Sequence, residues 1–177
     1  MRCLLKQLIV PQVEYGCVIW HPRSQQHTTL LESVQRRYTK KFPCYWVHNN
    51  ELDRYECHTS YADRLKYLKI FSLERRRERY VILMIYTVAI KHIVNPDLVV
   101  EVDQRGRWYV QRKFTKNPTI PTWIQYARNN GFHSFGPSLF NSLPGHLRIK
   151  VESPAASGRQ AQVSSFKRKL DKFLGGH

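Results

Sequence analysis

Acidic residues are scarce in this sequence of 177 residues. Only 13 Asp and Glu stand against 29 Lys and Arg, which gives a formal net charge of +16 at pH 7. Such an imbalance favours polyanionic partners, with nucleic acid first and anionic membrane surfaces second. A run of like charges can also be no more than a solvated face, so charge alone indicates only a class of partner.

Cysteine is also rare. The four cysteines are too few and too scattered for a disulfide framework in a chain of this length: Cys3, Cys17, Cys44 and Cys57. Lys6 and Gln7 interrupt the short apolar run behind Met1, so no secretory signal is evident. We therefore expect an intracellular, reducing compartment, and the sequence does not distinguish nucleus from cytoplasm.

No apolar run is long enough to cross a bilayer. The most apolar stretch covers residues 80–90, whereas a membrane-spanning helix needs about 20 such residues. This stretch predicts a buried helix and no membrane partner. A hydrophobic content of 42%, with 12% aromatic residues, argues against general disorder.

Signatures of catalysis and of cofactor binding are missing as well. The eight glycines are isolated or terminal, which excludes a glycine-rich phosphate loop, and no segment resembles a nucleophile elbow. Cys44, His48, Cys57 and His58 could be arranged around zinc. However, the adjacent Cys57 and His58 cannot easily both face one ion, and the spacing is weak evidence beside a paired CxxC. We expect no metal, no cofactor and no enzymatic activity of the chain on its own.

The first half of the chain has helical periodicity. Residues 2–20 predict a helix with a bend or break at Pro11. Thr29 and Glu32 have capping-box spacing at the start of a second helix, which ends before Pro43. A loop containing Cys and His follows. Two further helices are predicted over residues 60–69 and 72–93, the latter ending before Asn95-Pro96.

The second half changes character. Short runs of aromatic and β-branched residues predict two to four strands over residues 98–103, 107–115 and 122–127, with a hairpin turn at Asn130-Gly131. A short helix in residues 136–148 ends at Pro144-Gly145. The last segment is an amphipathic helix with Phe166, Leu170 and Phe173 on one face.

These elements predict a mainly α fold with a small α+β extension. We divide it into a helical region (1–95), an α+β extension containing a short β-hairpin region (96–150), a linker by composition (151–162) and a C-terminal amphipathic helix (163–177).

Basic residues gather in clusters that suit phosphate contacts. On the helix that starts near Thr29, an apolar stripe of Leu31, Val34, Tyr38 and Phe42 is expected to face the core, which turns a basic arc toward solvent. Residues 75–77 spread over about 200° of a helix, so at least one arginine is expected to pair internally, with Glu74 or Glu78 as candidates. The predicted nucleic-acid-binding residues are Arg36, Arg37, Lys40, Lys41, Arg75, Arg79, Arg107, Arg112 and Lys113.

Aromatic residues interleave with the basic residues of the predicted hairpin. Trp108, Tyr109 and Phe114 could stack on single-stranded bases, or they could belong to the core.

Tyr61-Ala62-Asp63-Arg64 shares three letters with the Tyr-x-Asp-Asp loop in which polymerases hold two metal ions. Arg64 replaces the second carboxylate, and none of the five Asp residues of the chain is adjacent to another. Tyr61, Leu65 and Leu68 fall on one helical stripe. We interpret the segment as a helix that Ser60 caps, with Asp63 as its capping-box partner.

Five segments, taken in chain order, resemble the C-terminal part of LINE-type (non-LTR) retrotransposon reverse transcriptases, which are RNA-directed DNA polymerases. Residues 4–22 resemble the thumb helix with its Pro-x-x-Glu-Tyr core and terminal Trp. Residues 30–42 contain the hallmark Leu-Glu-x-Val-Gln-Arg-Arg, and residues 61–79 resemble the Arg-Leu-x-x-Leu…Ser-Leu-x-x-Arg-Arg stretch. Residues 135–144 resemble a Leu-Trp-Asn-Ser-Leu-Pro segment, with Phe140 in place of Trp, and residues 165–174 resemble the terminal helix.

The resemblance implies a thumb that grips the backbone of a primer–template duplex, either an RNA–DNA hybrid or RNA, followed by a family-specific extension. Fingers and palm, which carry the catalytic aspartates, would precede Met1 and would be partners in a longer chain. The chain is thus expected to be a fragment that cannot polymerise on its own. Two alternatives stay open: a domesticated stand-alone module that binds RNA or a protein, and a degenerate product without function.

Overall fold

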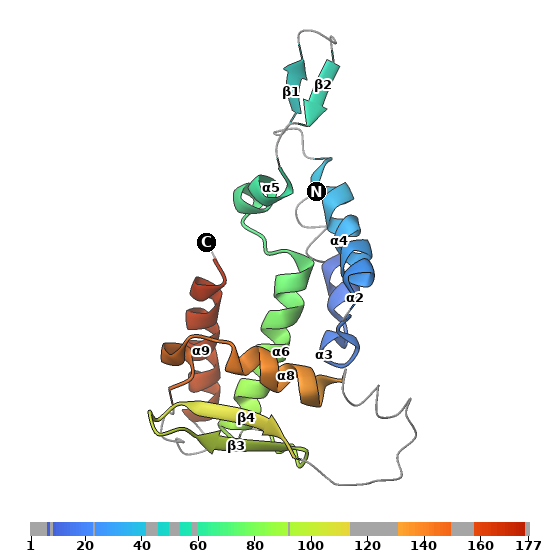
Figure 1. The fold of residues 1–177 in the computed structure, drawn as a ribbon. Coiled ribbons are helices and arrows are strands. Elements are labelled where there is room, and N and C mark those ends of the chain that lie inside the picture. Colours follow the sequence, from blue (N-terminus) through green and yellow to red (C-terminus); the bar gives the residue numbers. More distant parts are fainter. Residues whose placement is uncertain are drawn as a thin grey trace, which may run out of the picture. The chain divides into compact units, whose positions relative to one another are not determined.

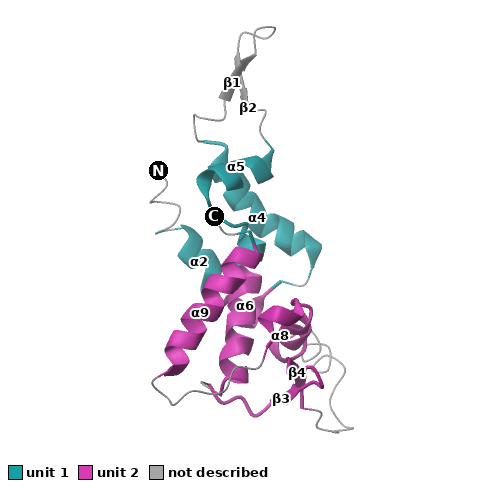
Figure 2. Ribbon diagram, turned by 90° about the vertical axis from the view of Figure 1, so that its left-hand side faces the viewer, with its two compact units in different colours: residues 1–15, 22–76, 175–177 teal, residues 16–21, 77–174 magenta. Residues whose placement is uncertain are grey.

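The computed structural model describes residues 7, 9–22, 24–41, 60–91, 93–113, 131–149 and 158–175, and the backbone alone of 46–49 and 54–57 (Figure 1). Over these residues the fold is mainly α with small antiparallel sheets, which confirms the predicted fold class. Contacts divide the chain into unit 1 (residues 1–15, 22–76 and 175–177) and unit 2 (residues 16–21 and 77–174), coloured separately in Figure 2.

These units do not coincide with the segments expected from the sequence. Helix α6 (Leu73–Ala89) contributes residues 73–76 to unit 1 and residues 77–89 to unit 2. The reason is packing, because the apolar side chains of residues 82–90 belong to a core that also takes in residues from 98 to 170.

Unit 1 contains helices α2 (Val10–Glu14), α4 (Gln25–Thr39) and α5 (Tyr61–Leu68). Its apolar core is small: Val10 and Leu73 are buried, with Ile9, Val13, Tyr38 and Ile70 packed around them. Strands β1 (Trp46–Asn49) and β2 (Arg54–Cys57) form an antiparallel pair in which Trp46 lies opposite Cys57. The loop predicted after Pro43 is therefore wrong in part, since residues 46–49 and 54–57 pair as strands.

The possible zinc ligands lie outside the described residues, apart from the backbone of His48 and Cys57. Among the residues whose side chains are described, no group of three His, Cys, Asp or Glu could hold a metal ion.

The first helical segment is interrupted at Gly16 and not at Pro11. Pro11 lies in the first turn of α2, where a missing N–H costs no helical hydrogen bond. Gly16 adopts φ 63°, a left-handed conformation that a residue with Cβ reaches only at a cost, and it separates α2 from α3 (Cys17–Trp20).

The Tyr61-Ala62-Asp63-Arg64 segment is the first turn of α5, as predicted. The N–H of Asp63 donates to Ser60 Oγ at 3.2 Å, and that hydroxyl donates to Asp63 Oδ2 at 2.6 Å. Lys69 ends the helix in a left-handed conformation with φ 51°. Asp63 is therefore a helix-start residue.

Unit 2 has the larger core. Apolar side chains of α6 pack with those of α8 (Phe132–Asn141), η3 (Gly145–Leu147) and α9 (Arg159–Phe173). Tyr86 is central: its ring stacks on Phe166 with centroids 3.8 Å apart and meets the edge of Trp108 at 5.5 Å. A Cβ at Gly136 would lie 2.9 Å from Cδ1 of Ile85, so glycine permits the close approach of α8 to α6.

Strands β3 (Leu98–Val102) and β4 (Trp108–Arg112) form the antiparallel hairpin of unit 2, with Val100 opposite Val110. The second edge of β4 is covered by side-chain and loop groups. Asn141 accepts from Val110 N at 3.1 Å and donates to Val110 O at 2.7 Å, while Trp108 N donates to Arg148 O at 2.7 Å. The side-chain amide of Asn141 thus makes the hydrogen bonds to β4 that a neighbouring strand would otherwise make.

Several predicted boundaries in the second half need correction. Gly131 of the predicted Asn130-Gly131 turn is the N-cap of α8, and Phe132 and Phe140 of that helix turn toward the core of unit 2. Asn130 lies outside the described residues. The predicted third strand (122–127) lies outside the described residues.

Helix α9 begins at Arg159, so residues 159–162 are not linker. Phe166 and Leu170 are buried as predicted, but Phe173 is 48% exposed, and Leu174 packs against the core in its stead. Helix α6 ends at Ala89, a few residues before the expected end at residue 93 and, as expected, before Asn95-Pro96.

Candidate nucleic-acid interface

The C-terminal end of α4 presents four cations. Arg36 and Arg37 occupy its last turn, Lys40 is the C-cap, and Lys41 follows it; all four side chains are exposed. Positive charge is favourable at this end of a helix, where carbonyl groups lack intrahelical donors. We call Arg36, Arg37, Lys40 and Lys41 the α4 basic cluster.

The face of α4 that is buried differs from the predicted one. Thr28, Glu32, Gln35 and Thr39 are buried and lie at i, i+4, i+7 and i+11, which places them on one stripe. We call them the polar stripe. Of the predicted apolar stripe, Leu31 and Tyr38 are half-buried, Val34 is 40% exposed, and Phe42 lies outside the described residues. Polar side chains can take the inner face only if partners satisfy them, and Glu32, Gln35 and Thr39 have such partners.

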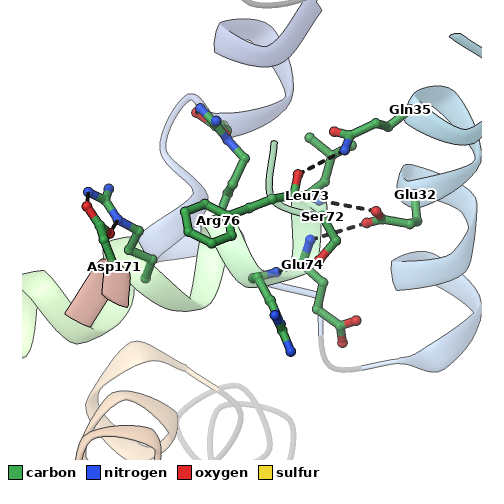
Figure 3. Close-up of polar contacts among 11 residues, drawn as sticks. Glu32, Gln35, Ser72, Leu73, Glu74, Arg76 and Asp171 are labelled. Atoms are coloured by element: carbon green, nitrogen blue, oxygen red, sulfur yellow. Dashed lines mark hydrogen bonds and ion pairs between the residues drawn. The ribbon is translucent and has the colours of Figure 1, made fainter. Parts of the chain in front are cut away.

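Glu32 is the centre of the polar stripe. Its carboxylate accepts hydrogen bonds from the N–H of Leu73 and of Glu74, each at 3.2 Å (Figure 3). It also accepts one from the hydroxyl of Tyr61. The N–H groups at the start of α6 have no partner within their own helix, and a carboxylate is a favourable acceptor there. The predicted Thr29/Glu32 capping box is therefore wrong, because Ser24 precedes the first residue of α4 and Glu32 caps another helix.

The two remaining contacts of the stripe fix α4 to α5 and to the segment before α6. Gln35 Nε2 donates to the carbonyl of Phe71 at 2.9 Å. The buried Arg64 donates through Nε to Thr39 Oγ1 at 3.3 Å, and Thr39 Oγ1 donates to the carbonyl of Arg36 at 3.1 Å. Hydrogen bonds are directional, and those of Glu32 and Arg64 are charge-assisted, so together these contacts fix the rotation of α4 about its axis. The α4 basic cluster is turned outward as a consequence.

Tyr61 connects this inner network to the surface. The guanidinium carbon of Arg36 lies 4.8 Å from the centroid of the Tyr61 ring, and that of Arg64 lies 5.7 Å from it. Burial, and then the hydrogen bond to Glu32, raise the pKa of the Tyr61 phenol far above its ordinary value. Tyr61 is therefore a neutral donor, and its ring holds one cation of the α4 basic cluster by a cation–π contact.

The arginines at the start of α6 have different surroundings. Arg75 is exposed. Arg76 forms a paired contact with Glu14, Arg77 is fully buried, and Arg79 pairs with both oxygens of Asp171. The expectation that at least one of residues 75–77 pairs internally is confirmed, with Glu14 as the observed partner of Arg76.

The predicted basic residues of the β3–β4 hairpin are partly engaged. Arg107 donates through Nε to Asp103 Oδ2 at 2.8 Å, and its N–H donates to Oδ1 of the same carboxylate at 2.8 Å. Hydrogen bonds from Arg107, the backbone one first, hold the pKa of Asp103 below its usual range. Arg112 is half-buried and Lys113 is exposed.

The aromatic residues of this hairpin divide between core and surface. Trp108 is 3% exposed and belongs to the core, whereas Tyr109 is 44% exposed. Phe114 lies outside the described residues.

The structure thus brings five of the nine predicted residues together in unit 1, namely the α4 basic cluster and Arg75. Arg79, Arg107, Arg112 and Lys113 belong to unit 2. Sequence reasoning missed Glu32, Tyr61 and Arg64 as the residues that orient the cluster. The signal was present in the i, i+4, i+7 spacing of Thr28, Glu32 and Gln35, which is as regular as that of the apolar residues.

The part of the chain that the structure describes has no helix that is both long and apolar enough to span a membrane. No protein-family model, curated protein or solved structure matches the chain.

Proposed function

We propose that the chain is a non-catalytic, C-terminal segment of a LINE-type non-LTR reverse transcriptase that binds the sugar–phosphate backbone of a primer–template duplex. The observation that carries this proposal is the α4 basic cluster, whose four cations lie on one exposed helix end. The polar stripe supports it, because it holds that end in one orientation.

Contacts of this kind position a duplex without selecting its sequence. Lys and Arg bind phosphate oxygens, which are the same at every base pair, and a part of a polymerase that holds a growing duplex must accept any sequence. Arg36 is pre-oriented by the Tyr61 ring, which lowers the conformational entropy lost when it binds a phosphate.

The resemblance supplies the enzyme class, and two structural details support it. Glu32, Gln35 and Arg36 belong to the hallmark segment 30–42, and they are the residues that build and orient the cluster. Asn141 belongs to the segment 135–144, and its amide completes the edge of β4. Both segments therefore contain polar residues with specific structural roles.

The test is a binding comparison between two variants with equal loss of charge. In the first, all four residues of the α4 basic cluster are replaced by Ala. In the control, four exposed cations of α9 are replaced by Ala: Lys167, Arg168, Lys169 and Lys172. Each surface ion pair with phosphate contributes about 0.5 kcal/mol or more, so the first variant should bind a duplex about 30-fold more weakly.

The loss should be similar for two duplexes of unrelated sequence, and the α9 control should keep most of the affinity of the unmutated protein. An equal loss in both variants would mean that diffuse charge, and not the α4 basic cluster, accounts for binding. Failure of the unmutated protein to bind any duplex at low salt would remove the proposal.

A further inference from the structure

Unit 1 contains a cavity of about 520 Å³ beside the α4 basic cluster. Residues of α4, of α5 and of the segment 70–75 line it. The volume falls within the range of about 300–1,000 Å³ that small-molecule sites occupy. A cavity of this size next to a phosphate-binding surface raises the question of what it accommodates.

The wall of the cavity has an apolar part and a cationic part. Leu65, Ile70 and Phe71 supply apolar surface, and all three are half-buried. Three exposed cations line the same cavity: Arg36, Lys66 and Arg75. An apolar wall with an aromatic ring suits a planar base, and a group of cations suits a phosphate.

The two carboxylates of the cavity have different roles. Glu32 already accepts three hydrogen bonds, from Tyr61 and from the N–H groups of Leu73 and Glu74, so it is a fixed part of the wall. Glu74 is exposed at the cavity and can accept hydrogen bonds from ribose hydroxyl or base amino groups. The donor and acceptor set therefore matches a nucleotide better than an inorganic anion or an apolar ligand.

We propose that this cavity binds one unpaired nucleotide, with its base against Leu65, Ile70 and Phe71 and its phosphate among Arg36, Lys66 and Arg75. The inference rests on the proposed function, since the nucleotide is the unpaired end of a strand whose duplex part contacts the α4 basic cluster. A free nucleoside monophosphate has the same chemistry, and the experiment separates the two sources.

The first arm fills the cavity. Ala62 is exposed and lines it, so Ala62→Trp occupies the volume without removing a cation. Ala161→Trp, at an exposed position of α9, is the matched control. The unmutated protein and the control should bind a duplex with a single-nucleotide overhang about tenfold more tightly than the blunt duplex, which is the scale of one base stacked on an aromatic side chain. Ala62→Trp should abolish this difference and leave blunt-duplex binding and its salt dependence unchanged.

The second arm uses adenosine monophosphate and adenosine as free probes. The monophosphate should bind about tenfold more tightly than the nucleoside, and Lys66→Ala should remove that advantage, whereas Lys172→Ala on α9 should keep it. Binding of the monophosphate that Ala62→Trp abolishes, with no overhang effect, would support the site with a free nucleotide as its ligand.

Failures of the two proposals have different signatures. Salt-dependent binding of blunt duplex without any overhang or monophosphate effect would overturn the cavity site and leave the proposed function intact. Monophosphate binding that Ala62→Trp abolishes, without any duplex binding, would overturn the proposed function and leave the cavity site intact. Equal binding of overhang and blunt duplexes by Ala62→Trp and the unmutated protein, together with no monophosphate binding, would overturn the cavity site whatever the duplex result.

Discussion

At the scale of single residues, Glu32 links stability to the candidate interface. Its carboxylate accepts hydrogen bonds from the first N–H groups of α6 and from the Tyr61 hydroxyl. The residue is only 6% exposed, although the sequence pattern predicts apolar residues on the buried face of α4. A buried carboxylate is stable only when donors surround it. Its removal leaves those donors without an acceptor.

Glu32→Ala should lower the free energy of unfolding by about 3 kcal/mol, because buried donors lose a charged acceptor. Glu32→Gln keeps one carbonyl oxygen in place and should lower it by about half as much. Ser33→Ala, on the neighbouring face of α4, is the control and should change it by no more than about 0.5 kcal/mol. Chemical denaturation measures all three, and a Glu32→Ala variant as stable as the Ser33→Ala control would contradict the assigned role.

Tyr61 gives a pH dependence with a definite sign. Burial first, and then Glu32, raise the pKa of its phenol above the ordinary value of 10, so the folded protein keeps the proton to a higher pH than the unfolded chain does. The stability that this neutral phenol contributes is complete below pH 10 and is lost as pH rises above it.

Tyr61→Phe should lower the free energy of unfolding at pH 8 by about 1 kcal/mol through the lost hydrogen bond. The difference between variant and unmutated protein should shrink at pH 11, since only the unmutated chain has this phenol to ionise on unfolding. Other titrating groups cancel in that difference. A difference that is the same at both pH values would show that Tyr61 is not the neutral donor described.

At the scale of elements, side chains make hydrogen bonds at the N-terminus of α6 and at the second edge of β4 that other backbone groups would otherwise make. Glu32 caps α6, and Asn141 of α8 pairs with both backbone groups of Val110 on β4. A two-stranded hairpin is marginal by itself, so the pairing of its second edge contributes to its stability.

Asn141→Ala should open this edge. The loss of two hydrogen bonds to a fully buried residue of β4 should lower stability by about 2 kcal/mol and increase amide hydrogen exchange at Val110. Ser142→Ala, one residue further and exposed, should leave that exchange rate within about twofold of the unmutated protein. Unchanged protection of Val110 in Asn141→Ala would mean that the β3–β4 pair does not depend on Asn141.

Elements with strong periodicity could be predicted from the sequence. The helix at Tyr61–Leu68, the long helix over residues 73–89 and the C-terminal helix appear close to their expected positions. The sequence predicts Ser60 as a cap because its partner Asp63 is only three residues away. Local signals of this kind need no knowledge of tertiary contacts.

The misjudged elements depend on partners that are distant in the chain. The apolar residues Leu31 and Val34 predict the inner face of α4 because hydrophobicity normally decides burial, whereas Glu32 finds donors 41 and 42 residues further along the chain. For the same reason the local sequence Asn130-Gly131 predicts a turn, although Gly131 begins a helix that packs against a core built from other segments. The exposure of the α4 basic cluster could be predicted from the sequence, but the residues that orient it could not.

At the scale of the whole molecule, charge is the dominant property. A formal net charge of +16 favours association with any polyanion, so affinity alone says little about a specific interface. A specific interface is distinguished by the number of phosphate contacts that are lost when a defined set of residues is substituted. The salt dependence of binding counts them, because each phosphate neutralised on duplex DNA contributes about −0.9 to the slope of log K against log salt.

The most direct test is therefore a salt titration of the unmutated protein, of the variant without the α4 basic cluster and of the α9 control on one duplex. Circular dichroism and melting would first establish that all three are folded. Loss of the α4 basic cluster should flatten the slope by up to about 3 to 4 units, and the α9 control should keep the slope of the unmutated protein. An unchanged slope in a folded α4 variant would contradict the role of the α4 basic cluster and move the binding face to the β3–β4 hairpin.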